Sequence, residues 1–186
     1  MNNWNFALVF WGGAARGMAH IGVIQRLEEH EKTPSIITGT SIGAVIGAFY
    51  ACGYTSSEMK KIATEFNMLT LIDFDLTHGI MKGKKILRFL QKYLWETTFA
   101  ETKIKLIIVA TDIDTGEKII FTEGRIIDAI RASISIPGVF APYKHDGRKL
   151  VDGGLTENLP IEVLPKEIDV IAISVQLPIQ NNRKRW

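Results

Sequence analysis

Residues 35–52 read SIITGTSIGAVIGAFYAC, and this stretch decides the fold. Residues 35–38 have the length and β-branched content of a short strand, and residues 42–52 form a helical stretch that is small and apolar on every side. A helix without a polar face is buried all round. Between the two lies the sharp turn Gly39-Thr40-Ser41-Ile42-Gly43. A buried strand that turns directly into a buried helix is typical of α/β folds with a parallel sheet.

The alternation of strands and helices continues in both directions from this stretch. Expected strands cover residues 6–11, 105–111, 118–122, 149–151 and 169–175, and expected helices cover residues 15–30, 55–66, 84–94 and 126–134. The Thr55-x-x-Glu58 pattern is a capping box that starts the helix after residue 55. We therefore predict an α/β fold in one domain over residues 1–179, with a mostly parallel sheet covered on both faces. The basic tail 180–186 is expected to be frayed.

Composition and charge exclude several classes of protein. The chain has 186 residues and a formal net charge of +2, which is too small for a nucleic-acid binder that acts through bulk charge. The one cysteine, Cys52, excludes an internal disulfide framework and any CxxC metal or redox site. No signal peptide is visible, and the longest apolar run, residues 42–53, is shorter than the roughly 18 residues of a membrane span. We expect a cytoplasmic protein that needs no metal and no cofactor.

Ser41 is the best candidate nucleophile, because it lies at the centre of a Gly-x-Ser-x-Gly turn between a strand and a helix. Gly39 and Gly43 let neighbouring backbone approach without a Cβ clash. The N-terminus of the following helix favours negative charge that develops beside the serine. The structural alternative is that Ser41 only caps the helix.

A second glycine-rich turn, Gly12-Gly13-Ala14-Ala15-Arg16-Gly17, follows the first expected strand. Its spacing does not match the G-x-G-x-x-G dinucleotide fingerprint, and the chain has no G-x-x-x-x-G-K-[ST] phosphate loop. Free backbone N–H groups beside a nucleophile suit an oxyanion hole, which we assign to Gly12, Gly13 and Ala14. The alternative is a turn that serves only the packing of helix on strand.

A nucleophilic serine needs a proton acceptor, which is most often histidine. His145, which follows Asp112 and Asp114, satisfies the order that an α/β-hydrolase triad requires, but it lies in a polar turn that we expect to face solvent. The better candidate base is Asp152, at the end of an apolar strand. Gly153 and Gly154 follow it and leave room for a substrate, although Asp-Gly-Gly is also an ordinary turn.

Taken together, these motifs resemble the patatin-like phospholipase family over nearly the whole chain. Residues 12–17 correspond to the family's oxyanion loop, residues 39–43 to its nucleophile elbow, and residues 152–154 to its D-G-[GA] motif. Residues 17–23 (GMAHIGV) and 131–140 (RASISIPGVF) also resemble family signatures. The resemblance implies a three-layer α/β/α fold and a Ser41–Asp152 dyad that hydrolyses lipid acyl esters without histidine. The implied activity is of phospholipase A, lysophospholipase or lipid acyl hydrolase type.

One departure from the family pattern keeps alternatives open. Ala14 stands where a third glycine is usual, and only glycine adopts a positive φ cheaply. A catalytically weak or inactive lipid-binding module on the same fold is therefore one alternative, and an acyltransferase is another. Arg16 is a candidate for binding an anionic head group, or it forms a salt bridge on the first helix.

The expected partner is a lipid or ester substrate, with transient contact at a membrane surface and no nucleic acid; the sequence leaves the oligomeric state open. Residues 67–81 (NMLTLIDFDLTHGIM) are a candidate lid over the acyl chain, or a loop packed on the core.

Overall fold

The computed structural model describes residues 5–65 and 83–176. The expected lid at 67–81 and the tail at 180–186 lie outside the described residues. The strands are β1 (Phe6–Phe10), β2 (Ile36–Thr40), β3 (Lys105–Asp112), β4 (Lys118–Phe121), β5 (Tyr143–His145), β6 (Arg148–Asp152) and β7 (Asp169–Ile173). The α-helices are α1 (Ala19–Glu29), α2 (Ile42–Ala51), α3 (Ser56–Glu65), α4 (Lys84–Leu94) and α5 (Ile126–Ser133). Short 3₁₀ helices are η1 (Ala14–Met18), η2 (Phe99–Glu101) and η3 (Gly153–Leu155).

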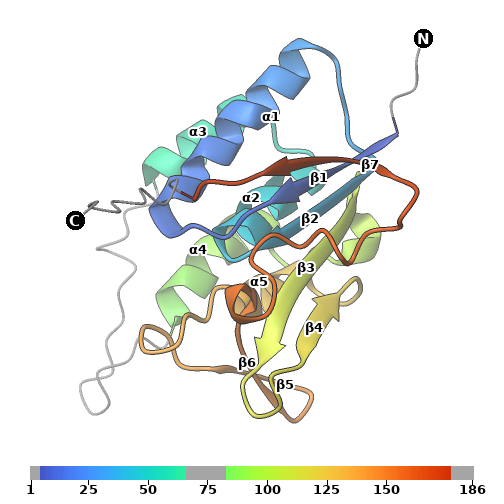
Figure 1. Cartoon of the computed structure of the whole chain (residues 1–186). Helices are drawn as coiled ribbons and strands as arrows, with labels where there is room; N and C mark the ends of the chain where they lie inside the picture. Colours follow the sequence, from blue (N-terminus) through green and yellow to red (C-terminus); the bar gives the residue numbers. More distant parts are fainter. Residues whose placement is uncertain (1–4, 66–82, 177–186) are drawn as a thin grey trace, which may run out of the picture.

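The strands form one sheet in the order β5-β6-β3-β2-β1-β7, with β4 paired to β3 (Figure 1). The pairs β3-β2, β2-β1 and β1-β7 are parallel, as the alternating pattern predicts. The pairs that involve β4, β5 and β6 are antiparallel, so only the central part of the sheet is parallel. The cause is local: β5 and β6 are joined by Asp146-Gly147, both with positive φ, which makes a tight hairpin.

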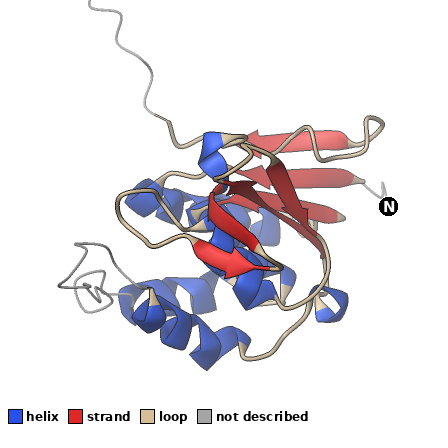
Figure 2. Ribbon diagram, turned by 90° about the horizontal axis from the view of Figure 1, so that it is seen from below, coloured by secondary structure: helices blue, strands red, loops and turns tan. Residues whose placement is uncertain are grey.

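The two faces of the sheet are covered differently. All five α-helices share one continuous core with one face, and Figure 2 shows them gathered on one side of the strands. On the opposite face, Ala7, Ile36 and Ile107 pack against apolar residues of the irregular segment 155–168. The α/β class and the central sheet flanked by helices are confirmed, whereas in the described residues the second outer layer is this segment rather than α-helices.

The strand period of two explains how β2 serves both layers. Ile37 faces the helices, while Ile36, Thr38 and Thr40 face segment 155–168. The Thr38 and Thr40 hydroxyls donate to the carbonyls of Pro160 and Glu157, at 2.7 and 2.8 Å. These bonds hold the irregular segment on the sheet and place its first residues beside the end of β2.

Most expected elements are present with small shifts at their ends. The capping box before α3 is confirmed, since Thr55 N–H donates to the Glu58 carboxylate at 2.8 Å and Glu58 N–H donates to the Thr55 hydroxyl at 3.2 Å. The single helix expected over 15–30 is wrong at its start, where η1 precedes α1. A Cβ at Gly17 would lie 2.2 Å from the Ile42 side chain, so the first turn is pressed against α2. β5 and η2 are additional elements.

Candidate active site

Ser41 occupies a strained turn between β2 and α2. Its φ of 56° and ψ of −125° lie in a region that costs a residue of this kind of order 1–3 kcal/mol. Its N–H donates to the Ser133 hydroxyl at 2.8 Å, and that hydroxyl donates to the Val109 carbonyl at 2.7 Å. The surrounding hydrogen bonds therefore hold the strained backbone in place and leave the Ser41 side chain for other contacts.

The two glycines that flank Ser41 are required by close backbone approach. A Cβ on Gly39 would lie 2.5 Å from the Gly43 carbonyl, and a Cβ on Gly43 would lie 2.5 Å from the Phe10 carbonyl oxygen. Both distances are far below any van der Waals contact, so the first turn of α2 fits against β1 and β2 only with glycine at these positions. The Gly-x-Ser-x-Gly spacing around Ser41 is therefore explained by the close packing of the backbone on both sides of the turn.

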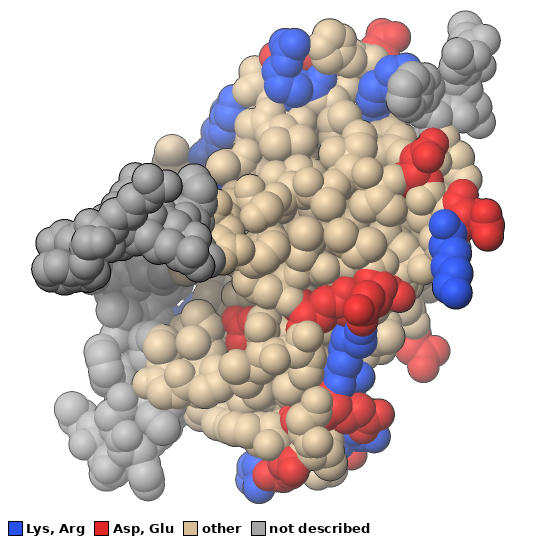
Figure 3. Space-filling view, in the orientation of Figure 1, with Lys and Arg blue, Asp and Glu red and all other residues tan. Residues whose placement is uncertain are grey.

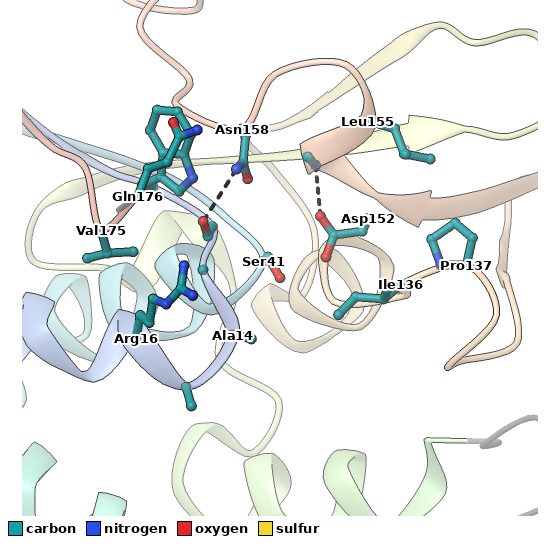
Figure 4. Close-up of a pocket in the computed structure, with 15 residues that line it drawn as sticks. Ala14, Arg16, Ser41, Ile136, Pro137, Asp152, Leu155, Asn158, Val175 and Gln176 are labelled. Atoms are coloured by element: carbon teal, nitrogen blue, oxygen red, sulfur yellow. Dashed lines mark hydrogen bonds between the residues drawn. The ribbon is translucent and has the colours of Figure 1, made fainter. Parts of the chain in front are cut away.

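Asp152 ends β6 and faces the Ser41 hydroxyl across the site (Figure 4). Its Oδ1 accepts a hydrogen bond from Gly154 N–H at 2.8 Å, and its own N–H donates to the Ser135 carbonyl at 2.9 Å. Burial raises the pKa of Asp152 above its usual value, while hydrogen bonds from the Ser41 hydroxyl and the Gly154 N–H oppose the shift. The site therefore holds a carboxylate that is more basic than one in water and oriented toward a serine.

Gly153 allows Asp152 to reach this position. A Cβ at Gly153 would lie 2.3 Å from the Val109 carbonyl oxygen, because η3 turns directly over β3. The sequence assigns Gly153 and Gly154 to the acid motif, and the structure shows their separate contributions. Gly153 gives space, and Gly154 supplies the N–H that orients the carboxylate.

The loop from residue 12 to residue 14 lies beside Ser41, but its three N–H groups are not equivalent. Gly12 N–H donates to the Asn158 carbonyl at 3.0 Å and is already engaged. The N–H groups of Gly13 and Ala14 have no acceptor among the residues that the structure describes. The loop therefore offers two free donors rather than the three expected from the sequence.

Ala14 has a positive φ of 47°, in the left-handed region. This conformation costs alanine about 1–2 kcal/mol, and glycine adopts it freely. Because Ala14 already has the left-handed conformation, its N–H points in the same direction as that of a glycine would. The strain therefore lowers the stability of the protein and leaves the direction of this donor unchanged.

We expect Ala14→Gly to raise the free energy of unfolding by about 0.5–1 kcal/mol, the relief of strain exceeding the added entropy of the unfolded chain. The hydrolysis rate should change by less than about tenfold, because the N–H is already placed. Urea unfolding and ester hydrolysis measure the two effects. Ala15→Gly is the matched control and should lower stability, because Ala15 has no positive φ. An equal decrease in the free energy of unfolding in both variants would show that Ala14 is not strained.

Asn158 is a part of the site that the sequence does not reveal. Its carbonyl accepts from Gly12 N–H, and its Nδ2 donates to the Gly12 carbonyl at 3.4 Å (Figure 4). A Cβ at Gly12 would lie 2.4 Å from the Asn158 side-chain oxygen, so a larger residue at this position would have to displace the Asn158 side chain. Asn158 and Gly12 are far apart in the chain, so no local spacing could have paired them.

The described histidines do not reach Ser41. His145 lies in β5 with its ring against Phe121 and Tyr143, and His30 lies on the surface beside Arg26. His20 is fully buried in α1 and donates from Nε2 to the Trp11 carbonyl at 2.8 Å, which anchors the start of the glycine loop. Burial lowers the pKa of His20 below its usual value, so it stays neutral. Among the described residues, Asp152 is the acid or base that faces Ser41.

Two cavities meet at Ser41. An open one of about 640 Å³ is bordered by the glycine loop, Asp152, Asn158 and Arg16 (Figure 4). An apolar one of about 290 Å³ runs from Ser41 among α2, α3 and α4. Arg16 forms no ion pair with any described residue, so the salt bridge considered from the sequence is absent there. The site thus combines an open side, where Asp152, Asn158 and Arg16 stand among apolar residues, with a narrower side that is apolar apart from Ser41.

Other features of the described residues bear on the remaining expectations. No helix in this part of the chain is both long and apolar enough to cross a bilayer. The face drawn in Figure 3 carries acidic and basic side chains interspersed around an uncharged centre, without a continuous basic surface. In the described ranges no three His, Cys, Asp or Glu side chains converge in a way that would hold a metal ion.

Comparisons with known proteins support the family expected from the motifs. Residues 8–165 match the model of the patatin-like phospholipase family. An uncharacterised NTE family protein of Mycobacterium bovis is 38% identical over 174 residues, which cover 92% of this chain and 48% of that protein. Lysophospholipase NTE1 of Meyerozyma guilliermondii is 30% identical over 190 residues, which cover 98% of this chain and 13% of that protein. The chain therefore spans about half or less of the length of these relatives.

Solved structures share the fold at low sequence identity. VipD from Legionella pneumophila superposes with a TM-score of 0.72 at 16% identity, covering 92% of this chain and 49% of VipD. The type III effector protein ExoU has a TM-score of 0.52 at 16% identity, covering 72% of this chain and 40% of ExoU. With a family model that matches residues 8–165 and a fold that agrees, the chain belongs to the patatin-like phospholipase family.

Proposed function

We propose that this chain is a serine acyl-ester hydrolase that acts on lipid through a Ser41–Asp152 dyad. The observation that carries the proposal is the strained Ser41, whose hydroxyl faces the buried carboxylate of Asp152. The N–H groups of Gly13 and Ala14 lie beside it and have no acceptor in the described part of the chain. This combination supplies a nucleophile, a base and oxyanion donors within one cavity. Membership of the patatin-like phospholipase family supports a lipid substrate.

In the proposed reaction, Ser41 Oγ attacks the ester carbonyl carbon while Asp152 accepts the hydroxyl proton. The carbonyl oxygen becomes an oxyanion that receives hydrogen bonds from Gly13 N–H and Ala14 N–H. Collapse of this intermediate breaks the ester bond, and Asp152 returns the proton to the departing alcohol. Water, activated by Asp152, then attacks the acyl-serine and releases the fatty acid.

A carboxylate is a weak base for a serine hydroxyl, so the surroundings must contribute. Burial raises the pKa of Asp152 and brings it closer to that of the group it must deprotonate. The N-terminus of α2 begins at Ile42, directly after Ser41, and its dipole favours the negative charge on the intermediate. The helix dipole and the N–H groups of Gly13 and Ala14 act on the negative charge of the intermediate, so they stabilise the oxyanion more than the neutral substrate.

The two cavities suggest which parts of a lipid lie where. The apolar cavity suits one acyl chain, and the open cavity suits the alcohol part of the ester. Arg16 borders the open cavity without a described ionic partner, and a guanidinium suits a phosphate there. One apolar slot favours substrates with a single acyl chain, in keeping with the name lysophospholipase carried by a relative.

Exposed apolar side chains near the mouth of the open cavity support contact with a lipid surface. Leu155 is 61% exposed, and Ile136 and Val139 are each 37% exposed. Leu155 and Ile136 border the cavity itself. Apolar groups at the rim of a site are suited to touch a lipid layer from which a substrate enters.

A fluorophosphonate probe tests whether Ser41 is a nucleophile. We expect covalent labelling of the folded protein at Ser41, located by mass spectrometry of the labelled peptide, and none after urea unfolding. The unfolded sample is the control, because an activated serine depends on the tertiary structure. A folded protein without label at Ser41 would overturn the proposal and favour a lipid-binding module on the same fold. Acyl transfer is tested separately, by adding an alcohol to the hydrolysis assay. Formation of the ester of that alcohol in place of the free fatty acid would indicate an acyltransferase.

A further inference from the structure

The apolar cavity has a direction that is set by one helix. Four side chains of α2 border it, at the spacing of a single helical face: Ile42, Val45, Ile46 and Phe49. The cavity therefore follows α2 away from Ser41. A helix rises 1.5 Å per residue, so the path from Ser41 to Phe49 is about 12 Å long.

Among the α2 residues that border the cavity, Phe49 lies farthest from Ser41. Its side chain is only 3% exposed and packs edge-on against Tyr54, with 5.1 Å between ring centroids, and against Tyr93, at 6.0 Å. The Tyr54 hydroxyl donates to the Tyr93 carbonyl at 2.7 Å, which locks the two tyrosines together. Phe49 borders the cavity, whereas Tyr54 and Tyr93 pack on its ring without bordering the cavity. We refer to the three rings as the aromatic end wall, because a chain that displaced Phe49 would break this packing.

The sides of the slot come from two helices that are tied to each other. Met59 and Ile62 of α3 and Leu90 of α4 border the cavity. Glu65 at the end of α3 accepts hydrogen bonds from Lys92 and from Tyr93 of α4, at 2.8 and 2.5 Å. Tyr93 takes part both in these hydrogen bonds between α3 and α4 and in the packing on Phe49. The same residue therefore helps to fix the distance between the two helices and the position of Phe49.

We propose that Phe49 sets the longest acyl chain that the site accepts, at roughly ten carbons, a limit that rests on the proposed hydrolase function. An extended chain advances about 3.5 Å per three bonds, or about 1.2 Å per bond, so ~12 Å holds roughly ten carbons. Shorter chains leave the slot partly empty. Longer chains meet the aromatic end wall and gain nothing further from burial.

Hydrolysis of p-nitrophenyl esters with acyl chains of about four to sixteen carbons tests this limit. Each buried CH₂ is worth about fourfold in kcat/KM, so the wild-type value should rise steeply up to roughly ten carbons and then level or fall. Phe49→Leu and Phe49→Ala open the end of the slot and should move the maximum to longer chains, by about two to four carbons for alanine. Val45→Phe blocks the slot one turn earlier and should move the maximum about five carbons shorter.

Phe121→Leu is the matched control for loss of aromatic packing. Phe121 is 9% exposed, packs against His145 and borders neither cavity, so this variant should keep the wild-type chain-length profile. Because the Phe49 variants and Val45→Phe move the maximum in opposite directions, general destabilisation cannot imitate the result. An unchanged maximum in both Phe49→Leu and Val45→Phe would overturn the inference.

A binding measurement separates this inference from the proposed hydrolysis. Ser41→Ala protein should bind saturated fatty acids, measured by calorimetry, with the tightest binding near the same roughly ten-carbon length. The double variant with Phe49→Ala should shift that length upward. Length-selective binding without hydrolysis by the wild type would refute the proposed function but keep the slot. Hydrolysis with no dependence on Phe49 would refute the slot but keep the function.

Discussion

Ser41→Ala should lower kcat for ester hydrolysis by on the order of 10⁶-fold, because removing the nucleophile of a serine hydrolase costs about this much. The change deletes one oxygen and leaves the backbone bonds of residue 41 intact, including its N–H to the Ser133 hydroxyl. We therefore expect the unfolding midpoint in urea to stay close to that of the wild type. The measurement is the initial rate of hydrolysis of a medium-chain chromogenic ester, with unfolding followed in parallel.

Ser35→Ala is the matched control for Ser41→Ala. Ser35 is exposed before β2 and borders neither cavity, so its loss should leave the rate unchanged. Substantial hydrolysis by a folded Ser41→Ala protein would show that another group attacks the ester. The dyad would then be wrong.

Asp152→Asn should reduce kcat by about 10⁴-fold or more, since the amide cannot accept the serine proton. The size and shape of the side chain stay the same, and the amide oxygen can still accept from Gly154 N–H. Loss of activity in this variant therefore reports the missing base rather than a changed cavity. Asp128→Asn, at a carboxylate that binds Arg125 outside the site, is the control for a neutralised acid.

The Asp152→Asn variant should also be more stable than the wild type at neutral pH. The pKa of Asp152 is raised in the folded state, mainly by burial, so its protonated form is the one that folding favours. The stability from this group is present below the ordinary pKa of about 4 and is lost as pH rises through the raised value. The substituted amide stays neutral at every pH. The variant should therefore have a higher free energy of unfolding than the wild type near pH 7, and the difference should vanish near pH 3, where Asp152 is protonated in both the folded and the unfolded state. A gain that does not depend on pH would contradict this origin.

The wild-type rate should follow the ionisation of Asp152. The ionised carboxylate is the base, so kcat/KM should fall as pH drops through the raised pKa, at a pH above the usual value for aspartate. An acid limb at or below the ordinary aspartate pKa would argue against Asp152 as the base.

The elements next to Ser41 were predictable because their signals are local. The apolar helix at 42–52 can be stable only when buried, and Gly39 and Gly43 are needed within one turn of each other. The same holds for α4, whose predicted bounds of 84–94 are those observed. Helical periodicity and the glycine spacing of a turn involve residues that are close in the sequence, so they can be recognised without knowing the tertiary structure.

Three features of the site depend on distant parts of the chain. The Gly12 N–H donates to the carbonyl of Asn158, which lies 146 residues later in the chain. The antiparallel pairing of β6 with β3 places Asp152 opposite Ala110, and no local pattern marks this pairing. The apolar cavity is bordered by side chains of α2, α3 and α4, which meet only in the fold, while the lid expected at 67–81 lies outside the described residues and stays a prediction.

The sequence by itself determined the class of the fold, the strand-to-helix turn that holds Ser41, and the Asp-Gly-Gly turn at Asp152, because each rests on residue types at short, fixed spacing. Only the tertiary structure decided which loop N–H groups lack an acceptor among the described residues, that Ala14 is strained, and which helices border the apolar cavity. Those properties arise from backbone and side chains that meet across the sheet and between helices. They are set by topology and packing, which no local pattern records.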